Sequence, residues 1–262
     1  MELQRRLPDL TAAGILPLAV SYDPPDALAA FAAEHGIEYP LLADRGSRVI
    51  RRYGILNPEI APGEEHHGIP IPGSYLVASD GRVEQKFFHS SHRVREAGAA
   101  LVRRLGGRAA PDSWPSARSD DGSVGITATL EAPSFRFGQV VDLVVRLEPR
   151  PGLHLYGRPA PAGFYPTTVT VGSASPLDVS EALYPATEPY RVRGLDVEFA
   201  GFSGEIEVVV PLVSRSREGT VPLDVEVSYQ ACSESECYIP RTGRLRLEAA
   251  TAPLVPGRPP AG

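Results

Sequence analysis

Cysteine is scarce in this sequence of 262 residues: the chain has two, Cys232 and Cys237, and none before them. Two cysteines are too few for a disulfide framework. A structural zinc site needs two further ligands, and the sequence close to the pair does not supply them. Residues 1–105 alone are excluded from thiol chemistry, because the thiolate is the nucleophile.

Basic residues and long apolar runs are also lacking. The chain has 26 Lys and Arg against 32 Asp and Glu, a formal net charge of -6. Without a basic surplus to neutralise phosphates, we expect no nucleic-acid partner. No run approaches the roughly 18 apolar residues of a membrane span, and the start MELQRRLPDL lacks the apolar core of a signal peptide. We therefore expect no membrane span, and the sequence leaves the compartment open.

The first 105 residues alternate helical and strand patterns. Leu3, Leu7 and Leu10 lie on one helix face, with Pro8 as a predicted kink. Further helices are predicted over 25–36, 45–54 and 93–105, and strands over 15–23, 39–44 and 73–88, the last divided by an Asp80-Gly81 turn. This order predicts an α/β domain with a mixed sheet over residues 1–105.

The pattern changes after residue 105. Residues 106–123, GGRAAPDSWPSARSDDGS, are small, polar and rich in Pro and Gly, and we interpret them as a linker. From 124 to 250 the sequence holds short β-rich runs between Pro and Gly, several of which alternate apolar and polar residues, as in an antiparallel sandwich. Residues 251–262 are predicted to form a disordered tail. Length and this change in character favour two domains.

Several ordered motifs lie between residues 19 and 55, in AVSYDPPDALAAFAAEHGIEYPLLADRGSRVIRRYGI. They are Ser-x-Asp, an aromatic residue five positions before Gly, Tyr-Pro-Leu-Leu-x-Asp and Tyr-Gly-Ile. This series resembles the redoxin family, the peroxiredoxin and alkyl-hydroperoxide-reductase branch of the thioredoxin fold. The matching positions are Ser21, Asp23, Phe31, Gly36, 39–44 and 53–55. The resemblance also implies a cis-proline at Pro72, before the hairpin.

The resemblance further implies a reactive cysteine, which residues 1–105 do not contain. In the family this cysteine follows a strand and begins the first long helix, whose N-terminus lowers its pKa. The chain begins inside that helix, so we expect its strand and catalytic loop to be missing. Either the start site is misassigned within a longer gene, or the domain is a degenerate redoxin. We favour the longer gene, because a sheet without an internal strand leaves backbone groups unpaired.

Motifs of the second domain lie in three segments, PSFRFGQVVDLVVRLEPRPGLHLY, VPLDVEVSYQAC and CYIP. They resemble the N-terminal, immunoglobulin-like domain of DsbD-type thiol:disulfide interchange reductases. In that family Tyr-Gln-x-Cys and Cys-Tyr-x-Pro flank a short loop, often one residue longer than SESE, and the cysteine pair passes electrons to periplasmic partners. The matching residues are Tyr229, Gln230, Cys232, Cys237, Tyr238 and Pro240. The resemblance implies a redox-active pair in an extracytoplasmic setting.

The spacing of the two cysteines suits a disulfide. If strands 224–231 and 238–247 form a hairpin, Cys232 and Cys237 are its last cross-strand pair, with Cα atoms roughly 4.5 to 5.5 Å apart. This distance lies inside the disulfide window of about 4.4 to 6.8 Å. A six-residue loop yields only about 2 kcal/mol of stabilisation, so stability alone is a poor reason for the bond.

Three interpretations of the pair remain open from spacing alone: a staple, a redox centre, or a metal clip. Glu234 and Glu236 disfavour a thiolate, so the pair is better suited to being attacked as a disulfide. A metal clip needs two more ligands, and His154 is the only histidine of the second domain. The Tyr-Gln-x-Cys context favours redox exchange.

Two further groups of residues are weaker candidates for functional roles, one as a metal site and one as a cap over the cysteines. His66, His67, His89 and His92 gather near Glu64 and Glu65, but adjacent histidines in a Pro/Gly-rich loop are more often solvated than metal-bound. The resemblance implies a cap loop over the cysteines within 184–201. There Tyr184, Tyr190 and Phe199 otherwise indicate core and edge packing.

We therefore expect two domains, an incomplete thioredoxin-like α/β redoxin domain (1–105) and an immunoglobulin-like β-sandwich (124–250). The expected function is that of a thiol-disulfide oxidoreductase or electron relay exchanging through Cys232 and Cys237, with no cofactor beyond this disulfide and no metal. Its partner is a thiol-disulfide protein, or the redoxin domain of a longer gene product. The expected supporting residues are Tyr229, Gln230, Tyr238, Pro240 and Pro72. The alternative is a non-catalytic scaffold with a structural disulfide.

Overall fold

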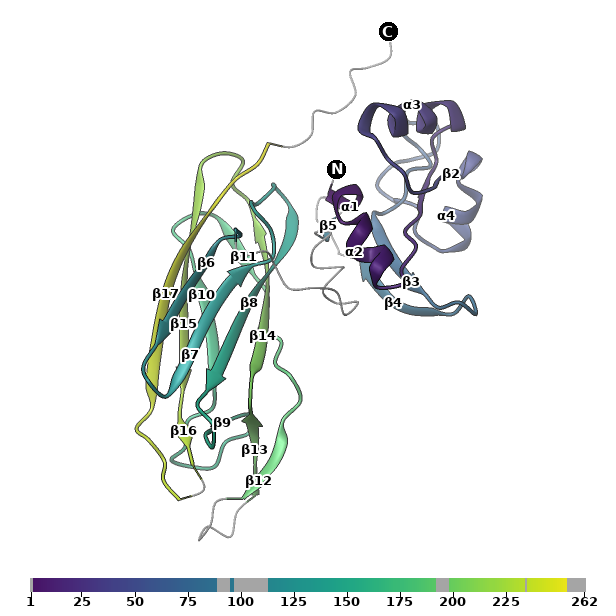
Figure 1. Ribbon diagram of the computed structural model, residues 1–262. Coiled ribbons are helices and arrows are strands. Elements are labelled where there is room, and N and C mark those ends of the chain that lie inside the picture. Colours follow the sequence, from purple (N-terminus) through teal and green to yellow (C-terminus); the bar gives the residue numbers. More distant parts are fainter. Residues whose placement is uncertain (1, 89–94, 97–112, 192–197, 234, 254–262) are drawn as a thin grey trace. The chain divides into compact units, whose positions relative to one another are not determined.

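The computed structural model describes residues 2–88, 95–96, 113–191, 198–233 and 235–253. The chain divides into two compact units, residues 1–109 and 110–262, and each is described by itself (Figure 1). The first, the redoxin portion, combines short helices and short strands. The second, the sandwich, consists of strands over the residues that the structure describes.

The helices of the redoxin portion follow the sequence signals closely. They are α1 (Glu2–Arg5), α2 (Leu7–Ala12), α3 (Pro25–His35), the 3-10 turn η1 (Arg45–Ser47) and α4 (Arg48–Arg52). The kink predicted at Pro8 is a break between α1 and α2, with Pro8 in the first turn of α2, where its missing N–H is tolerated. Gly36 ends α3 in the left-handed conformation, φ 59°. Asp44 anchors α4 by accepting the N–H groups of Val49 (3.1 Å) and Ile50 (2.8 Å).

The strands of the redoxin portion form two separate pairs. β1 (Ala19–Ser21) pairs in parallel with β2 (Leu41–Ala43), and β3 (Gly73–Val77) pairs antiparallel with β4 (Val83–Phe88). The Asp80-Gly81 hairpin is confirmed: Gly81 has φ 86°, and the Arg82 N–H donates to the Asp80 carboxylate at 2.9 Å. The single mixed sheet that the sequence predicted is not found among the described residues, where each pair forms its own sheet.

Two predictions for this portion are wrong within the described residues. The bond before Pro72 is trans, because the single cis peptide bond there is Arg158–Pro159. Residues 69–71 already run extended beside 55–57, with the Ile71 N–H donating to the Ile55 oxygen at 2.6 Å, and a trans bond continues that course into β3. Residues 95–96 form a strand, β5 (Arg95–Glu96), where a helix over 93–105 was predicted, and the rest of that range lies outside the described residues.

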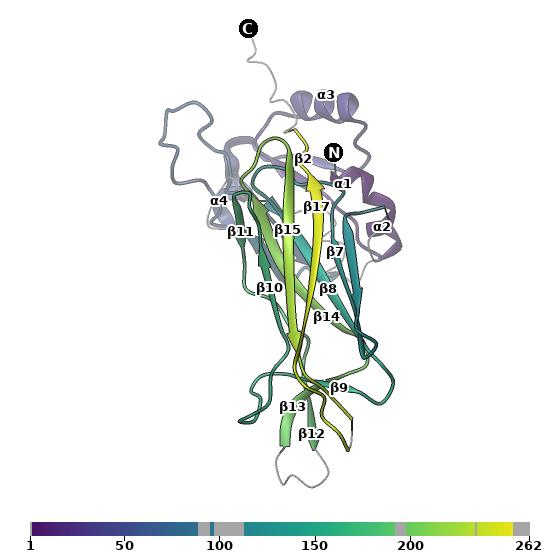
Figure 2. The same ribbon diagram turned by 90° about the vertical axis from the view of Figure 1, so that its left-hand side faces the viewer.

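The sandwich has two principal antiparallel sheets. One has the order β11 (Leu177–Val179), β14 (Ile206–Ser214), β8 (Gln139–Pro149), β7 (Val124–Leu130), β6 (Ser116–Asp120). The other has the order β10 (Thr168–Gly172), β15 (Thr220–Tyr229), β17 (Arg241–Ala250). A smaller sheet, β12 (Glu188–Arg191), β13 (Glu198–Ser203), β9 (His154–Tyr156), β16 (Ala231–Cys232), lies at one end in both views (Figures 1 and 2).

The core of the sandwich follows from the burial patterns of its long strands. In β15, Val221, Leu223, Val225 and Val227 are buried and the residues between them are more exposed, so one face of the strand packs inward. β8 is buried almost throughout, as expected for a strand central to its sheet. The described residues therefore have the expected order, an α/β redoxin portion followed by an antiparallel sandwich.

Both ends of the sandwich are ordered where the sequence suggested irregular chain. Within the expected linker 106–123, Ser116–Asp120 forms β6, paired with β7 from Ser116–Thr129 to Asp120–Gly125. In the expected tail, the Thr251 N–H donates to the Gly219 oxygen at 2.9 Å and the Ala252 N–H to the Phe135 oxygen at 2.7 Å. A polar edge strand has one solvated face, so its sequence lacks the apolar run that would predict a strand. Residues 106–112 and 254–262 lie outside the described residues.

Candidate functional site

Cys232 and Cys237 form a disulfide at the small-sheet end of the sandwich, as the spacing predicted. They are an antiparallel bridge pair with Cα atoms 4.1 Å apart, closer than the roughly 4.5 to 5.5 Å expected for a cross-strand pair. Hydrogen bonds flank them on both sides, from the Tyr238 N–H to the Ala231 oxygen (2.9 Å) and from the Ser233 N–H to the Glu236 oxygen (2.7 Å). The turn between the cysteines is therefore a compact hairpin end.

The hairpin that carries the disulfide is not regular. β15 pairs with β17 down to Tyr229 and Arg241, whereas the next bridge joins Cys232 to Cys237, so the second arm holds one residue more than the first. The extra residue lies within 238–240, where Pro240 has no N–H for the ladder. Beyond this bulge β16 leaves β15 and pairs with β9, setting Ala231 opposite Leu155 and Cys232 opposite His154.

The two cysteines differ in their exposure to solvent. Cys232 is fully buried (0 % exposed), whereas Cys237 is exposed. Cys232 packs in a cluster with Tyr156 and Phe199, and Ala160, Phe164 and Tyr190 cover that cluster. An incoming group therefore meets Cys237 first. Tyr190 and Phe199 belong to the β12–β13 segment in which a cap was expected, and residues 192–197 of that segment lie outside the described residues.

The Tyr156 hydroxyl reaches both sulfurs. Its oxygen lies 3.3 Å from Cys232 Sγ and 3.5 Å from Cys237 Sγ, and the hydroxyl is the donor because a disulfide carries no proton. Tyr156 is fully buried on β9. Burial, and then the neighbouring Tyr190, raise the pKa of this hydroxyl, so it stays protonated at neutral pH. The sequence did not single out this residue, although Tyr156 is the last residue of PSFRFGQVVDLVVRLEPRPGLHLY, a segment that carries the resemblance.

Tyr229, a predicted supporting residue, faces away from the sulfurs. Its hydroxyl donates to Asp121 Oδ2 at 2.7 Å, and Arg241 Nη1 lies 3.0 Å from the same oxygen. Burial alone would raise the pKa of Asp121, but hydrogen bonds from Ser123, Tyr229 and two backbone N–H groups hold it well below 3.8. Burial and the Asp121 carboxylate raise the pKa of Tyr229. This residue ties β15 to the β6–β7 turn.

Gln230, a second predicted supporting residue, clamps two segments beside the disulfide. Its side-chain oxygen accepts the Tyr165 N–H at 3.1 Å, and its Nε2 donates to the Tyr238 oxygen at 3.0 Å. Tyr238 and Pro240 are exposed on the arm that carries Cys237, as is Ile239 (75 %). Gln230 thus holds in place the bulged arm on which the exposed sulfur lies.

The histidines differ in their surroundings. His154 is 2 % exposed, its ring centroid lies 3.7 Å from that of Tyr190, and burial lowers its pKa to about 4. His67 Nε2 accepts from Arg51 and its Nδ1 lies 3.1 Å from the Ile60 oxygen, while His66 lies 3.4 Å from the Tyr22 hydroxyl. No cluster of three metal-binding side chains occurs among the described residues, and His89 and His92 fall outside them.

A disulfide at one end of an immunoglobulin-like sandwich, preceded by a redoxin-like α/β portion, defines a protein built from two redox-family parts. Comparison with known families gives the particular parts. Residues 1–86 match the AhpC/TSA family, and residues 127–249 match the family described as thiol:disulfide interchange protein DsbD, N-terminal. The chain is an AhpC/TSA redoxin segment followed by a DsbD N-terminal domain, and both families point to thiol-disulfide redox roles.

Individual relatives are similar to parts of the chain. Peroxiredoxin Bcp of Escherichia coli (strain K12) is 29% identical over 85 residues, which are 32% of this chain and 54% of that protein. The chain thus spans about half the length of this curated relative. Among solved structures, the N-terminal periplasmic domain of ScsB from Proteus mirabilis is 20% identical with a TM-score of 0.37, covering 51% of this chain and 50% of that one. The Neisseria meningitidis complex of the DsbD and PilB N-terminal domains is 15% identical with a TM-score of 0.32, covering 52% and 88%.

Among the described residues, no helix is long and apolar enough to cross a membrane.

Proposed function

We propose that this chain exchanges thiols and disulfides with a partner protein through Cys232 and Cys237. The observation that carries the proposal is the asymmetry of the pair: one cysteine is exposed, the other is buried, and one protonated hydroxyl contacts the sulfurs of both. A bond that served stability alone would need neither an exposed half nor a hydrogen-bond donor. Its loop of six residues contributes only about 2 kcal/mol.

Exchange begins at the exposed sulfur. A partner thiolate attacks Cys237 Sγ, the bond between the two cysteines breaks, and its electron pair goes to Cys232 Sγ as a thiolate. A second partner thiolate then attacks the partner sulfur of the mixed disulfide, forms the partner's own disulfide and releases Cys237. Two electrons thereby pass from the partner to the pair, and the reverse sequence reduces a partner disulfide.

Tyr156 stabilises the leaving sulfur in this scheme. The Cys232 thiolate forms in an apolar cluster where water does not solvate it, and an unpaired buried charge is costly. The Tyr156 hydroxyl already lies 3.3 Å from that sulfur. A hydrogen bond from a neutral donor to an anion is stronger than one between neutral groups, so this contact strengthens as the bond breaks.

We also propose an extracytoplasmic setting, since disulfides form and persist in oxidising compartments. Rapid alkylation of free thiols in fractionated cells tests it. The expected result is an oxidised pair in the extracytoplasmic fraction, and a pair found reduced in the cytosolic fraction would contradict it.

A redox titration of the purified chain tests the exchange. We expect a reduction potential above about -300 mV, because bonds below that value resist cellular thiol pools and are structural. A lower potential would favour the alternative of a scaffold with a structural disulfide.

Trapping identifies the partner. Cys232→Ser leaves Cys237 exposed with no resolving sulfur, so this variant should accumulate mixed disulfides in an extracytoplasmic extract. The matched control is Cys237→Ser, which retains the buried sulfur alone and should trap nothing. Equal trapping by both variants, or by neither, would contradict the assignment of Cys237 as the attacked sulfur.

A further inference from the structure

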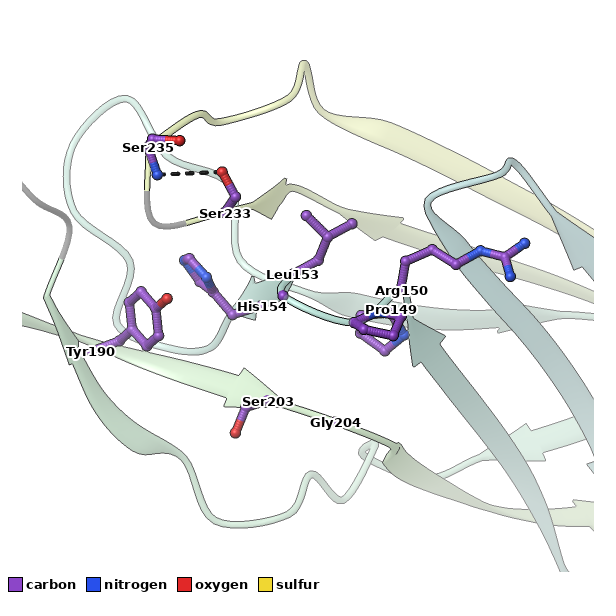
Figure 3. A pocket seen from close by; sticks show the side chains of 11 residues that line it. Pro149, Arg150, Leu153, His154, Tyr190, Ser203, Gly204, Ser233 and Ser235 are labelled. Carbon is purple, nitrogen blue, oxygen red and sulfur yellow. Dashed lines mark hydrogen bonds between the residues drawn. The ribbon is translucent and has the colours of Figure 1, made fainter.

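A pocket of about 500 Å³ lies beside the disulfide turn (Figure 3). Its walls come from the segment that joins β8 to β9, from β12 and β13, and from the turn between the cysteines. Its lining includes Pro149, Leu153, His154, Tyr190, Ser233 and Ser235. Figure 3 shows the His154 ring between Tyr190 and the two serines of the turn. The pocket thus reaches from the buried aromatic cluster to the loop that carries Cys237.

Among the residues that line this pocket, His154 is the one that indicates a ligand. Its side chain is 98 % removed from solvent, and both ring nitrogens are buried with no hydrogen-bond partner among the described residues. Buried polar groups in folded proteins are paired in the great majority of cases. Burial lowers the pKa of the ring to about 4, so at neutral pH it presents one donor and one acceptor.

The other residues that line the pocket indicate which chemical class of ligand fits it. The prolines, Leu153 and Tyr190 offer apolar walls, and the one charged lining residue, Arg150, lies 3.4 Å from both an Asp120 carboxylate oxygen and the Gly122 oxygen. A group that is uncharged and offers both a donor and an acceptor fits this lining better than an anion or a cation does. The peptide unit of a polypeptide is such a group.

The pocket is also within reach of the exchange reaction. Ser235 lies two residues before Cys237, and His154 is the strand partner of Cys232. A chain joined to Cys237 through its own cysteine gains about 3.3 to 3.6 Å per residue, so a peptide unit one or two residues from that cysteine can enter the pocket.

We propose that this pocket is a subsite for a peptide unit of the exchanging partner, held by the His154 imidazole while the partner's thiolate attacks Cys237. The inference rests on the proposed function and deepens it: the pair is specific for thiols carried on a polypeptide. His154 is then a specificity-determining residue, because it contacts the substrate and takes no part in bond breaking.

Two thiols test this specificity. Acetyl-Gly-Cys-Gly-amide carries peptide units next to its sulfur, and 2-mercaptoethanol carries none. The measurement is the rate of disulfide reduction per thiolate in the full chain. His154→Phe keeps an aromatic ring and removes both nitrogens. We expect it to slow the peptide thiol about tenfold and to change the 2-mercaptoethanol rate by less than about twofold. His66→Phe, in the redoxin portion, is the matched control and should change neither rate.

The outcomes separate this inference from the proposed function. Equal slowing of both thiols, or of neither, overturns the subsite. If wild type reacts with neither thiol, the proposed function fails, and a binding measurement then decides the subsite on its own. Titration with the thiol-free peptide acetyl-Gly-Ser-Gly-amide should shift the His154 ring resonances in NMR spectra of the oxidised chain. Unmoved resonances at millimolar peptide would mean that water satisfies the ring, and would overturn the subsite.

Discussion

The two units of this protein bury their apolar side chains to very different extents. In the described redoxin portion the buried apolar residues are Leu10, Leu28, Ile50 and Phe87, while Leu16 is 84 % and Leu18 57 % exposed. In the sandwich, buried residues occupy most positions of β7 and β14 and alternate along the full length of β15. A reactive group is better supported on the sandwich, because the position of a site is only as well fixed as the side chains packed behind it.

The disulfide lies on the better-packed unit. Cys232 and Tyr156 come from neighbouring strands, both are fully buried, and the strand ladder fixes their separation. We therefore expect exchange to depend on the sandwich and to be insensitive to the redoxin portion.

The largest expected effect is the loss of exchange itself. Cys237→Ser removes the attacked sulfur, so reduction by dithiothreitol should no longer release a titratable thiol pair. Leu42→Ser, in the redoxin portion, should leave the rate within about twofold, since Leu42 belongs to the other unit and to none of the contacts described around the disulfide. Alkylation followed by mass measurement reads both variants. A marked loss of exchange in Leu42→Ser would break the comparison between the two units.

The next effect is on stability. Leu143→Ala, at a fully buried position of β8, should destabilise the sandwich by about 3 kcal/mol through lost burial and an unfilled cavity. Leu42→Ala, at a position that is 47 % exposed, should cost less than about 1 kcal/mol. Denaturant unfolding checks both, with Trp114, the only tryptophan, reporting on the sandwich and circular dichroism of the helices on the redoxin portion. Similar losses for the two leucines would contradict the difference in packing.

A third effect concerns acid. Asp121 has a pKa held well below 3.8 by its hydrogen bonds, so its contribution to stability is complete above 3.8 and is lost as pH falls through the lowered pKa. Asp121→Asn should cost about 2 kcal/mol at neutral pH, where it removes a charged hydrogen-bond acceptor. It should also make the stability of the sandwich fall less steeply as the pH drops below 3.8. A decline as steep as in wild type would assign the acid sensitivity to other carboxyl groups.

The smallest effect separates two buried tyrosines. Tyr156→Phe should slow exchange about tenfold and barely alter stability, because it removes the donor to the leaving sulfur. Tyr229→Phe should lower stability by about 1 kcal/mol and leave the exchange rate unchanged, because its hydroxyl bonds Asp121. Stopped-flow reduction and thermal unfolding of both variants provide the test. The reverse pattern would mean that Tyr156 only packs.

The sequence predicts well those features that depend on neighbours along the chain. The Asp80-Gly81 turn, the break at Pro8 and the cysteine bridge all follow from local spacing, as does the alternation of apolar and polar residues in the β-rich runs of 124–250. Each of these needs a turn or a strand period and nothing else.

Features that depend on residues far apart in the chain could not be predicted from the sequence. Tyr156 contacts a sulfur 76 positions further along the chain, and nothing within β9 indicates that β16 will pair with it. Tyr229 was expected beside the cysteines because of its motif, yet the strand period turns its side chain toward Asp121. Pro72 was given a cis bond by family likeness, and the local ladder of residues 55–57 and 69–71 determines the conformation instead.

Because one cysteine is buried and the other is exposed, the proposed exchange reactions with donor and acceptor must follow one another in time. In the proposed exchange, electron donor and electron acceptor both react at Cys237, the exposed cysteine, so they cannot occupy the site together. Under the proposed function, each must leave before the other arrives, and the steady-state kinetics should be ping-pong, with each substrate inhibiting the other by occupancy at high concentration. The geometry of one side chain would then decide how this chain is shared between its partners.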